Sequence, residues 1–317
     1  MTLPQKGIEG TFAAPGKIVV ATDLTDTDYL LPHAIAQAKA SGASIILVHA
    51  VLPHESMPVE TGAVPYYDPL RMDRDARLML DGLARDVAGQ GVECVAAVRH
   101  GFVPDIVAEV VKNSSAGRLI LGTHGRRGLK KFVLGSVARQ LLETVEIPVC
   151  TVGPRAHKRT GDSVKTILHP VSLSGMHATS AALSISLGEQ FGAQVLLLHA
   201  IVPGPAVTRH VAEAMATATA ELERLIPDVA RAFTRVQAKI ALGSVVQEIL
   251  AAAHESEAGL IVLGVHAPAH SWLPGTEPAA YKILVSAPCP VISLRVNAAQ
   301  AEEKREPKEQ ATPLVFG

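Results

Sequence analysis

The chain has 317 residues, of which 48% are hydrophobic and 19% are charged, and its formal net charge is -1. A length of this order is typical of about two domains, and the apolar content can fill sizeable cores. The balanced charge and the 3% of aromatic residues argue against a nucleic-acid-binding surface. No apolar run is long enough to span a membrane, and the polar N-terminus lacks a signal-peptide centre, so we expect a cytoplasmic protein without membrane contact.

The chain contains an internal duplication. Residues 17–23 (KIVVATD) resemble 166–172 (TILHPVS), and residues 119–124 (LILGTH) resemble 261–266 (IVLGVH). The first pair is 149 residues apart and the second is 142 apart. The difference arises because the Pro- and Gly-rich segment 53–69 lengthens the first copy.

Short β-branched runs alternate with longer amphipathic segments in each copy. Continuous apolar runs are typical of strands buried on both faces, so the pattern predicts doubly wound α/β domains. In the first copy we expect strands near 17–22, 44–50, 92–98, 118–122 and 148–152. We expect helices near 27–41, 70–90, 104–116 and 136–146.

The duplication indicates two domains, at residues 15–153 and 163–296, joined by a segment of linker composition. Residues 297–317 contain the charged run AQAEEKREPKEQ and are poor in core-forming side chains. We therefore expect a flexible tail that contributes little to stability.

A glycine motif follows the fourth expected strand. Gly122 and Gly125 are followed, after nine residues, by Gly135-Ser136 at the start of a helix. Glycines let backbone N–H groups approach an anion, and a helix N-terminus favours a phosphate. Ser136 could add a donor or cap the helix. Charge screening of a phosphate could come from Arg126, Arg127, Lys130 and Lys131. The alternative is a turn that needs glycine for backbone reasons alone.

Asp23 stands at the carboxyl end of the first strand. Ligands of open α/β sheets bind outside the carboxyl ends of the strands, where the winding direction reverses. If strands one and four are neighbours there, Asp23 and Gly122 face one crevice. The carboxylate then needs a base, a ribose hydroxyl or a metal ion as its partner. The alternative is that Asp23 caps the helix that follows.

These motifs resemble the universal stress protein family in its ATP-binding subtype. The resemblance rests on VVATD, LVHAV, GTHGR, GSVA and IPV, in that order along the first copy. It covers nearly all of 15–153 and, more weakly, about 163–296, so the whole chain is similar to tandem universal stress proteins. It implies two five-stranded parallel sheets, each in the order 3-2-1-4-5 with helices on both faces.

The resemblance also implies an ATP site in the first domain, with Mg²⁺ accompanying the triphosphate rather than held by a metal centre of the protein. By position, the adenosine end would be lined by Thr22, Asp23 and Ala50. The ribose and phosphates would be held by Gly122, His124, Gly125, Gly135, Ser136 and Val137, with Arg126 beside them. No residue is assigned a catalytic role.

The second copy departs from this pattern. Ser172 replaces the aspartate, Ala267 replaces the second glycine, and Glu277-Pro278 stand nine residues later in place of Gly-Ser. A glutamate would repel a phosphate, so we expect the second copy not to bind nucleotide. Matching histidines in the two copies, such as His49 and His199, are interpreted as structural groups.

The sequence therefore predicts a stress-response protein that binds ATP in its N-terminal domain and signals nucleotide occupancy to an unknown protein partner. One alternative is a slow ATP-hydrolysing or nucleotidyl-transfer enzyme, for which only His124 or Asp23 can be nominated. Another is a nucleotide-free interaction module. In the resembling family the fifth strand mediates dimerisation, so strands 149–152 and 291–294 are expected to join the domains as a pseudo-dimer. A homodimer of the whole chain stays open.

Overall fold

The computed structural model describes residues 14–51, 69–123, 134–153, 155–156, 164–173, 178–204, 207, 210–226, 235–266 and 279–296. The strands are β1 Lys17–Ala21, β2 Ser44–Val51, β3 Cys94–His100, β4 Arg118–Gly122, β5 Val149–Val152, β6 Thr166–Pro170, β7 Gln194–Ile201, β8 Val236–Leu242, β9 Leu260–His266 and β10 Val291–Val296. The helices within these ranges are α1 Thr27–Ser41, α2 Pro69–Gly89, α3 Val103–Ser114, α4 Ser136–Thr144, α5 Ala178–Phe191, α7 Val211–Arg224, α9 Val245–Glu255 and α10 Ala279–Ser286.

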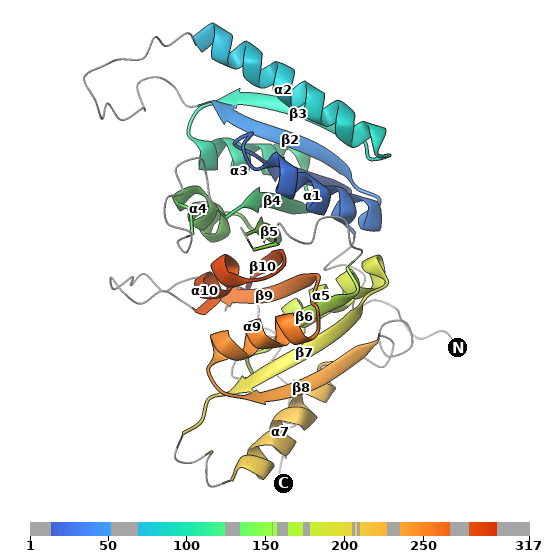
Figure 1. Cartoon of the computed structure of the whole chain (residues 1–317), viewed down its shortest axis with the longest axis vertical. Coiled ribbons are helices and arrows are strands. Elements are labelled where there is room, and N and C mark those ends of the chain that lie inside the picture. The colour runs from blue at the N-terminus through green and yellow to red at the C-terminus, as the bar shows by residue number, and fades with distance from the viewer. Residues whose placement is uncertain are drawn as a thin grey trace, which may run out of the picture.

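The strands form one sheet in the order β3-β2-β1-β4-β5-β10-β9-β6-β7-β8 (Figure 1). Strand pairing within each half is parallel, with β1 between β2 and β4 and with β6 between β7 and β9. Each half therefore has the expected order 3-2-1-4-5, and the predicted doubly wound fold is confirmed.

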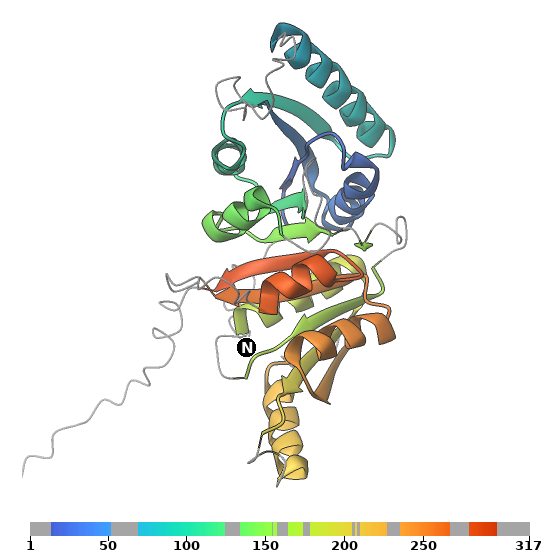
Figure 2. The same cartoon turned by 60° about the vertical axis from the view of Figure 1, so that its left-hand side comes forward.

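The two halves meet along β5 and β10, which pair antiparallel with Thr151 opposite Val291 and Val149 opposite Ser293. The seam lies at mid-height of the molecule in Figures 1 and 2, with one half above it and the other below. The expectation that the fifth strands join the halves is confirmed. Their pairing makes one continuous ten-stranded sheet.

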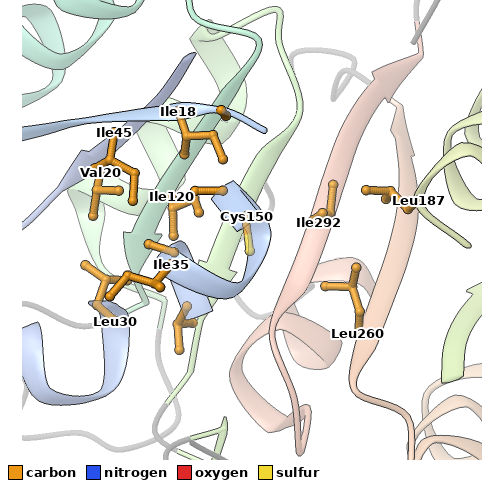
Figure 3. Close-up of a cluster of buried hydrophobic side chains, with 14 of the residues drawn as sticks. Ile18, Val20, Leu30, Ile35, Ile45, Ile120, Cys150, Leu187, Leu260 and Ile292 are labelled. Atoms are coloured by element: carbon orange, nitrogen blue, oxygen red, sulfur yellow. The ribbon is translucent and has the colours of Figure 1, made fainter. Parts of the chain in front are cut away.

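Helices cover both faces of this sheet. Buried side chains of α1, α2, α5 and α7 form one apolar cluster with the strands, and those of α3, α4, α9 and α10 form the other. Both clusters continue across the seam; Figure 3 shows Cys150 of β5 and Ile292 of β10 from the first cluster. In the described residues, no helix is both long and apolar enough to cross a membrane.

The third strand of the first half differs most from its expected bounds, while the other four agree to within one residue. The third strand was expected at 92–98 but lies at Cys94–His100, where Cys94 is the first residue paired with β2. Val92 is only 4% exposed and packs in the core before the ladder begins, and Gly91 turns the chain with a φ of 83°. A buried β-branched residue between a turn and the first paired residue therefore resembles the start of a strand.

Candidate functional site

The carboxyl ends of three neighbouring strands meet in the first half. The register of β1 with β2 and β4, continued past Ala21, brings Asp23 level with Ala50 and Thr22 level with Gly122. Four expected site residues thus lie together at the edge where the winding direction reverses. This is the place at which open α/β sheets bind ligands.

Side chains fix the turn that carries Asp23. The hydroxyl of Thr22 donates to Asp26 Oδ1 at 2.5 Å and accepts from the N–H of Leu24 at 2.9 Å. Asp23 Oδ1 accepts from the N–H and the hydroxyl of Thr25, at 2.8 and 2.5 Å. Leu24 has a φ of 70°, a left-handed conformation that non-glycine residues adopt only when the surroundings hold them there.

The second carboxylate oxygen of Asp23 differs from the first in its hydrogen bonding. Asp23 Oδ2 is buried and has no hydrogen-bond partner among the described residues. A buried carboxylate oxygen without a donor is costly, so this atom is suited to accept a hydrogen bond from a ligand. The capping alternative is wrong, because the N-cap of α1 is Asp26 and no side chain caps the helix.

Asp26 was not singled out from the sequence. It is 5% exposed, and burial raises the pKa of its carboxyl to about 6 despite the hydrogen bond from Thr22, while the nearby Asp23 raises it further. Burial and the same two carboxylates also raise the pKa of Tyr29. The four-residue spacing of Thr22 and Asp26 was the available signal, but such a spacing across a turn is not specific.

Backbone hydrogen bonds of Thr123 hold the two ends of the glycine motif. Its N–H donates to Val152 O at 3.0 Å, and its carbonyl accepts from the N–H of Gly135 at 2.9 Å. Both ends of the segment between Gly122 and Gly135 are therefore held beside β5. The N–H of Gly135 is engaged by Thr123 and cannot also bind a phosphate, which corrects part of the expectation for this glycine.

α4 starts at Ser136, with Gly135 as its N-cap and no side-chain capping hydrogen bond. The expected capping role of Ser136 is therefore wrong. The first N–H groups of an α-helix have no partner within the helix, so those of Ser136 and Val137 remain suited to an anion. His124, Gly125 and Arg126 lie outside the described residues.

The second half repeats the backbone of this edge without its acid. His199 Nδ1 lies 2.8 Å from Val171 O, as His49 Nδ1 lies 2.8 Å from Thr22 O. These contacts support the structural interpretation of this histidine pair. The place of Asp23 is taken by Ser172, which is exposed. Residues 267–278, with Ala267 and Glu277, lie outside the described residues.

Comparison with known proteins agrees with this architecture. The model of the universal stress protein family matches the chain twice, at residues 15–153 and 163–295. The chain belongs to the universal stress protein family. Because the two matches follow one another in a single chain, it is a tandem universal stress protein.

Sequence identity to individual universal stress proteins is low. One from Methanocaldococcus jannaschii is 27% identical over 139 residues, which is 43% of this chain and 81% of its own length. A solved universal stress protein from Archaeoglobus fulgidus has a TM-score of 0.70 at 16% identity and covers 90% of this chain and 99% of its own. A putative universal stress protein from Pseudomonas aeruginosa has a TM-score of 0.61 at 18% identity, covering 89% and 94%. Both structures support the fold across both halves.

Proposed function

We propose that the first half of this universal stress protein binds ATP with Mg²⁺ and that nucleotide occupancy is its signal to a protein partner. The adenosine end would lie against Thr22, Asp23 and Ala50. The phosphates would lie between Gly122 and the N-terminus of α4, with His124, Gly125 and Arg126 on the intervening segment. Mg²⁺ would accompany the phosphates of the bound nucleotide.

The main support for this proposal is the environment of Asp23 Oδ2. This atom is buried, has no partner in the described residues, and lies at the carboxyl end of β1. A carboxylate oxygen accepts hydrogen bonds only, so it selects a ligand that presents a donor there. A ribose hydroxyl or the amino group of adenine meets this requirement, whereas a phosphate is repelled. The carboxylate therefore faces the nucleoside and the glycines face the phosphates.

We expect nucleotide binding in the first half only. Ser172 is exposed and offers no carboxylate in the second half. A hydrogen bond to a charged group contributes about 1.5–3 kcal/mol, which corresponds to roughly 10- to 150-fold in affinity. The second half thus lacks the feature that suits the first half to a nucleoside.

Calorimetric titration of the full chain with MgATP tests the proposal. Asp23→Asn keeps the acceptor for Thr25 but places an amide where the second carboxylate oxygen lies, so we expect at least tenfold weaker binding. Ser172→Ala, the matched change in the second half, should leave the affinity unchanged. Equal affinity of the Asp23→Asn variant and the unaltered chain would contradict the assignment.

Two outcomes separate the alternative functions. If the unaltered chain releases ADP steadily above background, and Asp23→Asn abolishes this release, the protein is an ATPase. If it binds no ATP at millimolar concentration, it is an interaction module that works without nucleotide.

A further inference from the structure

α4 is held at both ends by different parts of the molecule. Its N-terminus follows Gly135, which bonds to Thr123 of the first half. Its C-terminal part faces the second half, and Figure 1 shows α4 and α10 on either side of the seam. The helix that carries the proposed phosphate site is therefore also part of the junction between the halves.

Three contacts from the second half meet near the end of α4. The hydroxyl of Tyr281 donates to Glu143 Oε1 at 3.1 Å, and Arg139 lies over the Tyr281 ring, 5.3 Å from its centroid. Arg295 Nη1 donates to the backbone carbonyl of Glu143 at 2.5 Å. The last carbonyls of a helix have no partner within it and carry its negative end, so a guanidinium there stabilises α4.

A second route of contact runs through the end of β5. A Cβ placed on Gly153 would lie 3.2 Å from the carbonyl of Leu284 in α10 and 3.7 Å from Thr123 Oγ1. The backbone of Gly153 thus separates α10 from the residue that holds the two ends of the glycine motif. A shift of α10 would therefore displace Thr123 as well as α4.

The contacts on α4 are not mirrored on α10. The 142-residue offset makes Arg139 equivalent to Tyr281, and makes Glu143 equivalent to Val285, whose side chain cannot accept a hydrogen bond. α10 instead meets the first half through Arg155 Nη1, 3.4 Å from Ser286 O. Because α10 lacks the equivalent contacts, the packing of two copies does not by itself require Tyr281, Glu143 and Arg295. These three residues stabilise the position of α4, which belongs to the half with the proposed site.

We propose that the second half positions the nucleotide site of the first: Tyr281 and Arg295 hold α4 through Glu143 and so keep its N-terminus at the phosphates. This inference rests on the proposed function. Tyr281 and Arg295 are positioning residues, because the contacts described above join them to Arg139 and Glu143 of α4, which are not residues of the proposed nucleotide site. The second half is then more than a packing partner, because it sets the affinity of a site to which it contributes no ligand.

MgATP affinity of full-length variants tests the inference. Tyr281→Phe removes the hydroxyl and keeps the ring, and Arg295→Met removes the guanidinium and keeps most of the stem. Each should weaken ATP binding about 2- to 30-fold, the usual range for residues that couple to a site without touching its ligand. Arg295→Lys should recover part of the loss. Arg155→Met is the matched control, because it removes a longer seam contact, 3.4 Å, to Ser286 O and none of the three contacts on α4 described above, so its affinity should stay within about twofold.

Coupling through Glu143 separates positioning from a general loss of structure. In a Glu143→Ala background the hydrogen bond from the Tyr281 hydroxyl to Glu143 is already absent, so Tyr281→Phe should cause a smaller further loss of affinity than it does in the unaltered chain. Thermal denaturation without nucleotide checks that each variant is folded at the titration temperature. Folded variants that bind ATP like the unaltered chain overturn this inference alone. Absence of ATP binding by the unaltered chain overturns the proposed function and this inference with it.

Discussion

Arg118 is a buried cation in the core of the first half. It is 2% exposed, its Nη1 donates to Gln37 Oε1 at 3.0 Å, and Gln37 Nε2 donates to Cys150 Sγ at 3.2 Å. Its Nε has no partner in the described part of the chain, and no carboxylate there forms an ion pair with it. Burial lowers the pKa of Arg118 to about 10. Such a group is expected to reduce stability at neutral pH.

The second half shows the apolar alternative. The residues equivalent to Arg118, Gln37 and Cys150 are all apolar, and Figure 3 shows them beside the seam: Leu260, Leu187 and Ile292. Each pKa unit corresponds to 1.36 kcal/mol, so the lowered pKa of Arg118 amounts to about 3 kcal/mol of destabilisation below pH 10. Arg118→Leu should raise the free energy of unfolding by about 1–3 kcal/mol, since part of the gain is offset by lost packing of the stem.

A double-mutant cycle measured by urea denaturation tests this reasoning. Gln37→Leu alone removes the acceptor of a buried guanidinium and should cost about 3 kcal/mol. In the Arg118→Leu background the same change places leucine at both positions, as in the second half, and should cost less than about 1 kcal/mol. An Arg118→Leu variant that is less stable, together with an equal cost of Gln37→Leu in both backgrounds, would refute the account of Arg118 as an uncompensated charge.

Two further predictions concern stability. Burial raises the pKa of Asp26 above its ordinary value of 3.8 to about 6, so the folded chain binds this proton more tightly and stability should fall as pH rises from about 4 to 6. Asp26→Asn should remove that part of the pH dependence, measured by urea denaturation at pH 4, 5, 6 and 7; an unchanged profile would show that Asp26 does not titrate there. Removal of residues 297–317 should leave the melting temperature nearly unchanged, because this charged segment cannot bury enough apolar area to offset its ordering. A drop of many degrees would show that its final Leu314-Val-Phe316 anchors it.

The fold was predictable because its signals are local and repeated. Apolar runs such as 119–122 predict the strands, and the duplication predicts the same topology twice. The boundary of β3 was missed because the buried side chain of Val92 resembles a strand residue, although Val92 precedes the first residue that pairs with β2. Antiparallel pairing of β5 with β10 at a defined register depends on the packing of both halves, which no local pattern encodes.

The candidate site was predictable in part. Strand order brings Asp23 and Gly122 to one edge, as the sequence suggested. The burial of Asp26 and the engagement of Gly135 by Thr123 were missed. Both depend on how a turn folds back on its own residues, and threonine and aspartate are too common in turns for their presence to identify such contacts.

Under the proposed function the chain binds one ATP, in its first half. Native mass spectrometry of the full-length protein titrated with MgATP measures the number of bound nucleotides directly. We expect one bound nucleotide per chain at saturation, an at least tenfold higher MgATP concentration for half-occupancy in Asp23→Asn, and no change in Ser172→Ala. Two nucleotides of similar occupancy, or one that persists in Asp23→Asn and disappears in Ser172→Ala, would contradict the account.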